Sequence, residues 1–335
     1  MRIPKYIQIK DKILADIRDK KLNPGDRLPT REELIAEYGV ARTTIARVFE
    51  ELDRLGVVQG QRGSGTYVAS LDISLKICII SSHKEKEYNN KQEPNDLAGM
   101  FNSMINSNGE MHLDFLGEGV VLKNSKVLDD YDAAVWVQPD DETMKKISGL
   151  KNKVIVTNRY PDDLNFVSTN HRQAINEVTK HYITNCDKKS QIFFLSHDDQ
   201  SFVMRQRKEG FIKACSEFQR FYRICEVGYS YDEILGSLLD LPLDTKKPII
   251  MISPSCNLTG AVLSMAKERG LEINKNLFYA DFDNIMSLQL SGVRISTVLQ
   301  NYAEMGRVVM DSIKLLGKKP VQVFVPYKII GLETE

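Results

Sequence analysis

The side chains best suited to chemistry near the start of the chain are the arginines and threonines of A-R-T-T-I-A-R, residues 41–47. Arginine can donate two hydrogen bonds to guanine or bind a phosphate, and threonine can bind a phosphate or contact a thymine methyl group. Apolar residues recur at helical spacing from about Ala41 to Leu55 and predict a helix with a buried stripe of Ile45, Val48, Phe49, Leu52 and Leu55. Its other face carries Arg42, Thr43, Ala46, Arg47 and Glu50 and suits the major groove of DNA.

Two strand-like segments follow, 57–59 and 66–69, and the glycine-rich run G-Q-R-G-S-G at 60–65 joins them. A hairpin with Arg62 at its tip can approach DNA closely, although such a turn can also be only a turn.

Two helices are predicted ahead of these residues, and they would position them. Tyr6, Ile9, Ile13 and Ile17 recur at three- and four-residue steps within 6–20, and N-P-G-D-R-L-P at 23–29 ends that helix. Thr30 stands three residues before Glu33, the spacing of a capping box, so a second helix should begin at Arg31 and end at Gly39.

The order helix, P-G-D-R-L-P-T, helix, V-A-R-T-T-I, helix, R-G-S-G-T-Y-V resembles the GntR family of bacterial regulators over residues 4–69. The resemblance implies a winged helix-turn-helix that binds operator DNA. It also implies DNA contacts from Arg42, Thr43, Thr44, Arg62 and Gly63.

Two departures from the family pattern add candidates. Ala46 stands where the family commonly has a basic residue, and Arg47 follows it. The arginine of the family's P-S-E-R-E-L lies one place earlier, at Arg31. We therefore nominate Arg31 and Arg47 as further DNA contacts, with solvated helix charges as the alternative role.

The rest of the chain alternates apolar strand-like segments with helical ones. The predicted strands are 76–81, 112–116, 133–137, 154–157, 166–168, 192–195, 224–227, 249–252, 277–280 and 294–298. The predicted helices are 96–105, 174–183, 202–218, 259–269 and 302–316. This alternation predicts an α/β fold with two parallel sheets, helices on both faces, and a ligand at the carboxyl ends of the strands. We expect a DNA-binding domain at 1–70, a linker at 71–75 and a two-lobed domain at 76–335.

Four short motifs of this region resemble the periplasmic-binding-protein-like effector domain of LacI/GalR regulators, over roughly 75–330. They are R-x-x-G-F at Arg207–Phe211, D-F-D-N at 281–284, T-V-L-Q at 297–300 before A-E-M-G, and V-S-T-N at 167–170. A GntR-type head on such a body is the arrangement of the arabinose-repressor subfamily. The resemblance implies a neutral monosaccharide such as a pentose or deoxyhexose (arabinose or fucose), a two-fold homodimer and a pseudo-palindromic operator.

A sugar site needs donors and acceptors for hydroxyls together with an aromatic wall. By resemblance Arg207 donates to sugar oxygens and Asp283 accepts from hydroxyls, while a helix N-cap is the rival role of Asp283. Further candidates are Asn158, Gln300, Ser82, His83 and, as a stacking platform or a plain core residue, Trp136. Pro254-Ser255 stands where the family that this region resembles often has an Asn-Asp pair, so an acidic acceptor for hydroxyls is missing. We therefore expect a ligand or a ligand orientation unlike that of common hexose regulators.

Composition narrows the classes of protein. Residues 1–70 hold 13 Lys+Arg against 10 Asp+Glu, and the remainder holds 32 against 35, which is compatible with nucleic-acid contact at one end. Five scattered cysteines favour a reducing cytoplasm without disulfides or a metal site, and no apolar run could span a membrane. No nucleotide-binding or nucleophile motif is present, so we expect no cofactor and no enzyme. A non-sugar effector (amino acid, nucleoside or sugar phosphate) and an enzyme fused to a DNA-binding head remain the alternatives.

Overall fold

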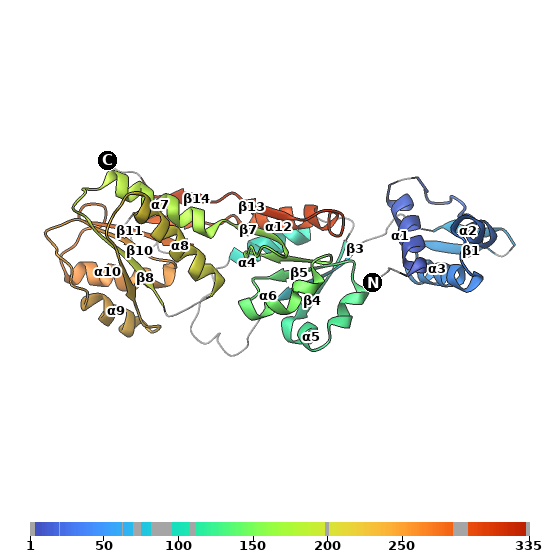
Figure 1. Cartoon of the computed structure of the whole chain (residues 1–335), viewed down its shortest axis with the longest axis horizontal. Helices are drawn as coiled ribbons and strands as arrows, with labels where there is room; N and C mark the ends of the chain where they lie inside the picture. Colours follow the sequence, from blue (N-terminus) through green and yellow to red (C-terminus); the bar gives the residue numbers. More distant parts are fainter. Residues whose placement is uncertain are drawn as a thin grey trace. The chain divides into compact units, whose positions relative to one another are not determined.

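The computed structural model describes residues 4–19, 21–61, 63–69, 75–81, 96–106, 111–197, 201–283 and 294–332. The chain divides into two compact units, one of Met1–Ile77 with Gly109–Leu113 and one of Cys78–Asn108 with Asp114–Glu335 (Figure 1). Each unit is described by itself below.

The first unit contains a winged helix-turn-helix. Its elements are α1 (Lys5–Arg18), α2 (Arg31–Tyr38), α3 (Arg42–Arg54), β1 (Val58–Gln61) and β2 (Gly65–Val68). β1 and β2 pair antiparallel, with Val58 opposite Val68 and Gln61 opposite Gly65. Arg27 forms an isolated bridge to Tyr67, so the segment before α2 extends this sheet. A single apolar core joins the three helices to the hairpin.

The capping box predicted at Thr30 is present. The Thr30 hydroxyl accepts from the Glu33 backbone N–H at 3.2 Å, and the Glu33 carboxylate accepts from the Thr30 N–H at 2.7 Å. Helix α2 ends at Gly39, whose φ of 60° is the left-handed conformation that glycine tolerates. The expected burial of Leu55 is wrong: this side chain is 46% exposed, because α3 ends at Arg54 and the chain turns at Gly56.

Two six-stranded sheets form the second unit, in the orders β13-β7-β6-β5-β3-β4 and β14-β12-β11-β10-β8-β9, except that the first residues of β3 and β4 are grouped with the first unit. The first sheet contains β3 (Leu75–Ser81), β4 (Met111–Gly117), β5 (Ala133–Val137), β6 (Val154–Thr157), β7 (Asn165–Thr169) and β13 (Gln322–Val325). The second contains β8 (Gln191–Ser196), β9 (Arg223–Glu226), β10 (Ile249–Ile252), β11 (Leu277–Phe282), β12 (Ser296–Leu299) and β14 (Lys328–Ile330). We refer to the two halves as the first and second lobes.

Most described strand pairs of these two sheets are parallel: β5–β6, β6–β7, β7–β13, β8–β9, β8–β10, β10–β11 and β11–β12. Among the described pairs of the two sheets, only β12–β14 is antiparallel. The chain runs through the first sheet to β7, through the second to β12, and then returns for β13 and β14. It therefore passes from one lobe to the other after β7, after β12 and after β13.

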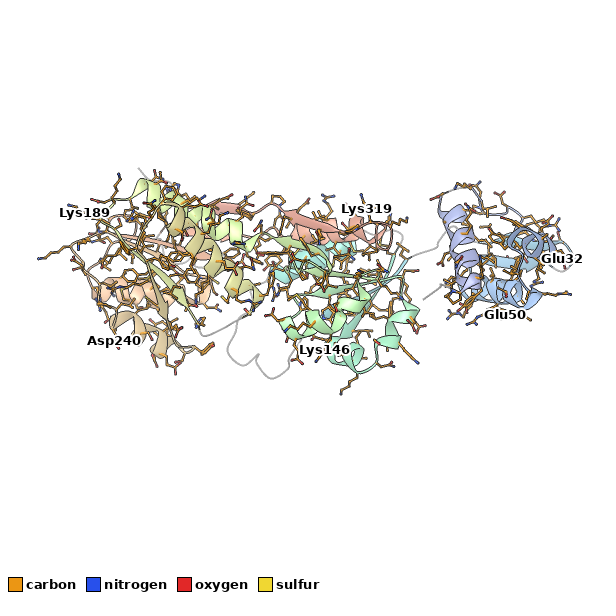
Figure 2. All side chains as sticks on the ribbon, in the orientation of Figure 1. Glu32, Glu50, Lys146, Lys189, Asp240 and Lys319 are labelled. Atoms are coloured by element: carbon orange, nitrogen blue, oxygen red, sulfur yellow. The ribbon has the colours of Figure 1, made fainter. Side chains whose placement is uncertain are left out.

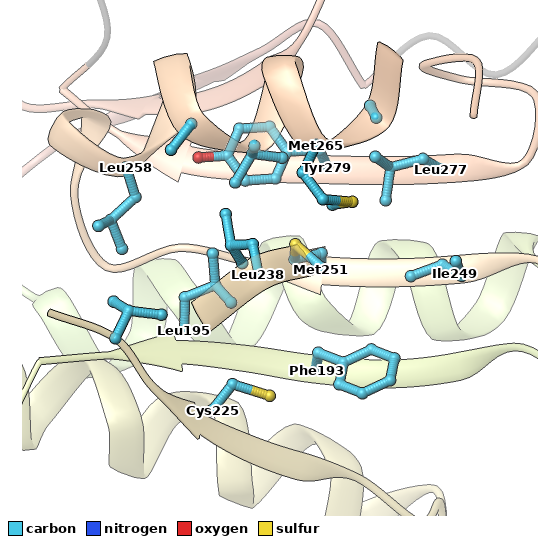
Figure 3. Close-up of a cluster of buried hydrophobic side chains, with 14 of the residues drawn as sticks. Phe193, Leu195, Cys225, Leu238, Ile249, Met251, Leu258, Met265, Leu277 and Tyr279 are labelled. Carbon is cyan, nitrogen blue, oxygen red and sulfur yellow. The ribbon is translucent and has the colours of Figure 1, made fainter. Parts of the chain in front are cut away.

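The helices of the second unit are α4 (Asp96–Asn106), α5 (Glu118–Lys123), α6 (Asp141–Ile147), α7 (His171–Asn185), α8 (Phe202–Glu217), α9 (Tyr231–Leu239), α10 (Thr259–Glu268) and α12 (Tyr302–Ile313). Alternate residues of the second sheet enter two different cores. Phe193, Met251 and Tyr279 face the core that includes side chains of α9 and α10 (Figure 3). Phe194, Ile252 and Phe282 face the core that includes side chains of α7 and α8. Both faces of the sheet are thus covered, as a parallel sheet requires.

Two motif glycines permit close helix packing. A Cβ at Gly210 on α8 would collide with the backbone oxygen of Arg172 on α7, and one at Gly306 on α12 would collide with that of Met100 on α4. The glycine of R-x-x-G-F therefore sets the distance between α7 and α8.

The fold is the α/β arrangement expected from the sequence, and each predicted strand has a counterpart within about two residues. The sequence prediction missed α5, α6, α9, β13 and β14. These elements are short, and β13 and β14 take their conformation from sheet neighbours that are distant in sequence.

Candidate nucleic-acid interface and ligand site

The exposed face of α3 carries the predicted DNA-binding side chains. Arg42, Thr43 and Arg47 are exposed and Thr44 is half-buried, while Ile45 and Val48 on the opposite side are fully buried. Glu50 and Glu32 are also exposed on α3 and α2 (Figure 2). The predicted contact residues of α3 therefore lie in its first two turns, while the exposed Arg54 of the last turn pairs with Glu51.

Two of the nominated arginines rest on aromatic rings. The Arg31 guanidinium carbon lies 4.9 Å from the centre of the Phe49 ring, and that of Arg47 lies 3.9 Å from the centre of the Tyr6 ring. Both side chains are nevertheless exposed, so cation–π contacts fix their direction without removing their charge from solvent.

In the hairpin, Gly63 is exposed with φ of 77°, and Ser64 bonds to the Tyr67 hydroxyl at 2.5 Å. A side chain at Gly63 would be strained, which agrees with a turn whose backbone faces outward. Arg62, the predicted tip residue, lies outside the described residues.

In the larger unit, Arg207 of α8 is only 6% exposed and three groups hold its guanidinium. Nη1 donates to the Pro254 carbonyl at 2.5 Å, Nη2 lies 3.3 Å from His171 Nδ1, and Cζ lies 3.5 Å from the centre of the Phe282 ring. Burial lowers the pKa of Arg207, and the nearby Asp283 carboxylate opposes that shift. A guanidinium stays charged in such a place, so this is a fixed buried cation.

Asp283 and Gln300 form a second polar group. The Asp283 carboxylate accepts from the Gln300 backbone N–H at 3.2 Å and from its side-chain amide at 2.6 Å. The same amide nitrogen lies 2.7 Å from the Tyr302 hydroxyl. Desolvation raises the pKa of Asp283, while Arg207 and the hydrogen bonds from Gln300 counteract that rise. Arg207 and Asp283 therefore lie close enough to influence each other electrostatically.

Asn158, Asp283 and Gln300 each directly follow the last residue of a parallel strand, β6, β11 and β12 respectively. Asn158 and Asp283 adopt φ values of 54° and 61°, which are uncommon for residues other than glycine. Such conformations concentrate at ligand sites, where surrounding structure enforces them. The carboxyl ends of parallel strands are also where α/β proteins bind ligands.

Four buried polar atoms of this cluster have no hydrogen-bond partner among the described residues. They are Oδ1 of Asn158, Oε1 of Gln300, Nε of Arg207 and Nε2 of His171. The two amide oxygens are acceptors and the guanidinium Nε is a donor, so the cluster can bind a molecule that carries several hydroxyl groups. Buried polar groups ordinarily have hydrogen-bond partners, so these atoms indicate a place where a ligand can supply them.

The expectation that Trp136 stacks on a ligand is wrong. Its side chain has no exposed surface and packs in the first lobe among Cys78, Ile80, Met144 and Ile147. Strand β5 is buried along its whole length, so both of its faces are covered. Ser82 and His83, the other first-lobe candidates, lie outside the described residues. The possible N-cap role of Asp283 is likewise untested, because residues 284–293 are not described.

The sequence prediction missed His171, Phe282 and Tyr302, which contact predicted site residues, and Tyr160, whose ring stacks on that of His171. His171 follows V-S-T-N directly and Phe282 lies inside D-F-D-N, so both adjoin motifs already identified. Gln138, which follows β5 with φ of 47°, was also missed. Its position directly after a predicted strand was the sequence signal that could have identified Gln138.

Among the residues that the structure describes, no group of three or more His, Cys, Asp or Glu could hold a metal ion. Nor is any helix there long and apolar enough to cross a membrane.

The family model of bacterial regulatory proteins, gntR family, matches residues 5–68. Three curated regulators are 33% to 42% identical to the chain over 82 or 83 residues, and the chain spans only 34% to 64% of their lengths. An arabinose metabolism transcriptional repressor of Geobacillus stearothermophilus is 21% identical over an alignment of 345 residues. That alignment covers 91% of this chain and 88% of the relative.

Two solved structures have a fold similar to that of this chain. A regulatory protein of the LacI family from Chloroflexus aggregans matches with a TM-score of 0.63 at 17% identity, over 76% of this chain and 96% of that one. The trehalose repressor from Escherichia coli matches with a TM-score of 0.60 at 13% identity, over 76% of this chain and 100% of that one. At these identities the similarity concerns the fold alone.

Proposed function

Since residues 5–68 belong to the GntR family of bacterial regulators and the larger unit has the fold of LacI-family regulators, we propose that this chain is a transcription regulator controlled by a small neutral ligand. The head binds operator DNA through Arg42, Thr43, Thr44 and the hairpin residues Arg62 and Gly63. Arg31 and Arg47 contribute further contacts. The protein acts in the cytoplasm as a homodimer on a pseudo-palindromic operator, and it is not an enzyme.

The ligand is a monosaccharide, held by Arg207, Asp283, Asn158 and Gln300, with Ser82 and His83 as further contacts. The observation that carries this assignment is the set of unpartnered buried atoms on Asn158, Gln300 and Arg207. One guanidinium and one carboxylate compensate each other, and the remaining groups are neutral amides, so the site suits hydroxyls better than a phosphate. The name of the arabinose metabolism repressor favours a pentose.

A thermal-shift screen tests the ligand class, because a molecule that binds only the folded state raises its stability by mass action. At a concentration of about 100 times Kd, the free energy of unfolding should rise by about 2.7 kcal/mol. L-Arabinose and L-fucose are the first sugars to test, with an amino acid, a nucleoside and a sugar phosphate representing the competing classes. A shift with the sugar phosphate alone would contradict a neutral ligand.

The Asp283→Ala variant separates the two functions. It should lose the sugar-dependent thermal shift and retain affinity for DNA, because the site and the head lie in different compact units. Gel shifts on a duplex selected from a random pool measure the DNA affinity. The exposed, ion-paired Glu272 provides a matched control as Glu272→Ala, which should leave both properties unchanged. Loss of DNA binding in Asp283→Ala would contradict the assignment of Asp283 to a site that contacts the sugar alone.

A further inference from the structure

We propose that His171, which the sequence did not suggest, is a positioning residue for Arg207: its neutral imidazole accepts from the guanidinium and holds it ready for the ligand. This inference rests on the proposed ligand site and assigns one further residue to it. His171 is the first residue of α7 and has no exposed surface.

The contacts of Arg207 leave few orientations open to it. Pro254 holds Nη1, Phe282 lies against the flat face of the guanidinium, and His171 Nδ1 faces Nη2 at 3.3 Å. Of these three partners, only His171 comes from α7, the helix that begins where the chain enters the second lobe. Removing it would free one edge of the guanidinium while Phe282 and Pro254 remain.

The ring of His171 is itself held on two sides. Its centroid lies 6.1 Å from that of Tyr160 at an interplanar angle of 22°, and 5.6 Å from that of Phe282 at 45°. Tyr160 belongs to the loop after β6 that also carries Asn158, and its hydroxyl accepts from the Arg172 N–H at 3.3 Å. The imidazole therefore links the loop of Asn158 to Arg207.

Nδ1 can accept a hydrogen bond only if it carries no proton, which places the single proton of a neutral ring on Nε2. Burial lowers the pKa of His171, and the neighbouring Arg207 and Arg159 guanidiniums lower it further. A charged ring would face Arg207 with a proton on Nδ1 and would repel it. The local charges thus favour the neutral ring, and the guanidinium that faces Nδ1 favours the tautomer that accepts there.

Two substitutions separate positioning from packing. His171→Phe keeps an aromatic ring between Tyr160 and Phe282 but removes the acceptor, whereas His171→Gln keeps an acceptor and loses the ring. Since a hydrogen bond to a charged group is being removed, the Phe variant should bind L-arabinose or L-fucose about 10- to 100-fold more weakly. The Gln variant should retain most of the affinity. A pure packing role predicts the reverse order.

Calorimetric titration of the full chain with each sugar measures these affinities, and His181→Gln, a change to the half-buried histidine ten residues further along the same helix, is the control. Binding of a random-sequence DNA duplex should be equal in all variants. Equal sugar affinity of the Phe variant and the native protein would overturn the proposal.

A second measurement needs no ligand. In 15N NMR of histidine-labelled protein, one of the five histidines should show an unprotonated Nδ1 and a protonated Nε2 across the neutral pH range. Its signal should disappear in His171→Gln. A protonated Nδ1 at His171 would overturn the proposal even if no sugar bound, whereas a failure of both sugars to bind the native protein would count only against the proposed ligand.

Discussion

At the scale of single residues, local environment decides what a side chain can do. Trp136 and Arg207 are both buried, but Trp136 is surrounded by apolar side chains whereas Arg207 is surrounded by polar groups and one ring. The indole of Trp136 packs in this apolar core with its N–H unpartnered among the described residues, while a buried guanidinium must be compensated by acceptors and a nearby carboxylate. The compensation of Arg207 by Asp283 and its other partners therefore distinguishes the proposed ligand site from the core around Trp136.

The lowered pKa of His171 predicts a specific pH dependence of stability. The unfolded chain takes up a proton near pH 6.5, whereas the folded protein resists it, because burial and the guanidiniums of Arg207 and Arg159 disfavour the charged ring. The uncharged phenol of Tyr160 and the Phe282 ring also face it. As pH falls below about 6.5, the free energy of unfolding should therefore decrease by about 1.4 kcal/mol per pH unit from this group.

Urea denaturation between pH 7 and pH 5 measures this slope. The His171→Gln variant should show a shallower slope by about one proton, since it has no group to titrate at this position. Burial also raises the pKa of Asp283, but Asp283 is present in both proteins, so its contribution to the pH dependence is common to the two slopes. Parallel slopes in the two proteins would contradict a buried neutral histidine.

At the scale of elements, α3 places its cationic side chains by helical spacing. Arg42→Ala should weaken DNA binding by about 1–3 kcal/mol if this side chain reads a base. Gel shifts on a selected duplex measure the effect. Arg54→Ala is a matched control on the same helix, because Arg54 lies in its last turn and pairs with Glu51 at 3.0 Å. If both variants lost affinity equally, a general charge effect would replace the specific role of Arg42.

The contact between α7 and α8 depends on Gly210. Gly210→Ala should lower the free energy of unfolding by about 1–3 kcal/mol, because the added methyl group meets the Arg172 backbone and the two helices must separate. Gly236→Ala on α9 should instead raise stability by up to about 1 kcal/mol, since nothing lies within 4 Å of the added atom. Thermal denaturation of both variants tests this opposite response.

The separation of α7 from α8 would also move His171 away from Arg207, because these residues lie on the two helices concerned. Gly210→Ala should therefore weaken sugar binding by more than the loss of folded protein alone accounts for. Unchanged sugar affinity in a destabilised Gly210→Ala protein would separate the helix contact from the site.

At the scale of the whole molecule, regulation requires the sugar and the DNA to affect each other's binding. Their coupling is reciprocal at equilibrium, so the factor by which L-arabinose changes DNA affinity must equal the factor by which DNA changes L-arabinose affinity. Factors of about 5 to 150 are typical of allosteric coupling. Titrations of sugar with and without duplex, and of duplex with and without sugar, should give one factor. Absence of any coupling would leave two independent binding functions.

Within the larger unit, side-chain contacts also join the two lobes. Arg205 of α8 pairs with Asp141 of α6 at 2.5 Å, and the Tyr160 hydroxyl donates to Gln206 at 3.0 Å. Both members of the ion pair are partly exposed, so solvent screens it and its contribution to stability is small. These contacts can orient the lobes without locking them.

The sequence by itself determined the elements and several of their ends. The spacing of Thr30 and Glu33 predicts the start of α2, and Gly39 predicts its end, because caps and glycine conformations depend on residues only a few positions apart. Local chemistry is enough for such features. Arg207 and Asp283 were instead nominated by the resemblance of their motifs to an effector domain, with Asn158 and Gln300 as further candidates.

Only the tertiary structure decided which of these residues work together. His171 reaches Arg207 across 36 positions of sequence, and the β13 and β14 segments join different sheets beside strands formed much earlier in the chain. Trp136 lost its predicted role because helices and strands that are distant in sequence cover both faces of β5. Burial and long-range partners are properties of the packed chain, and no short segment of sequence contains them.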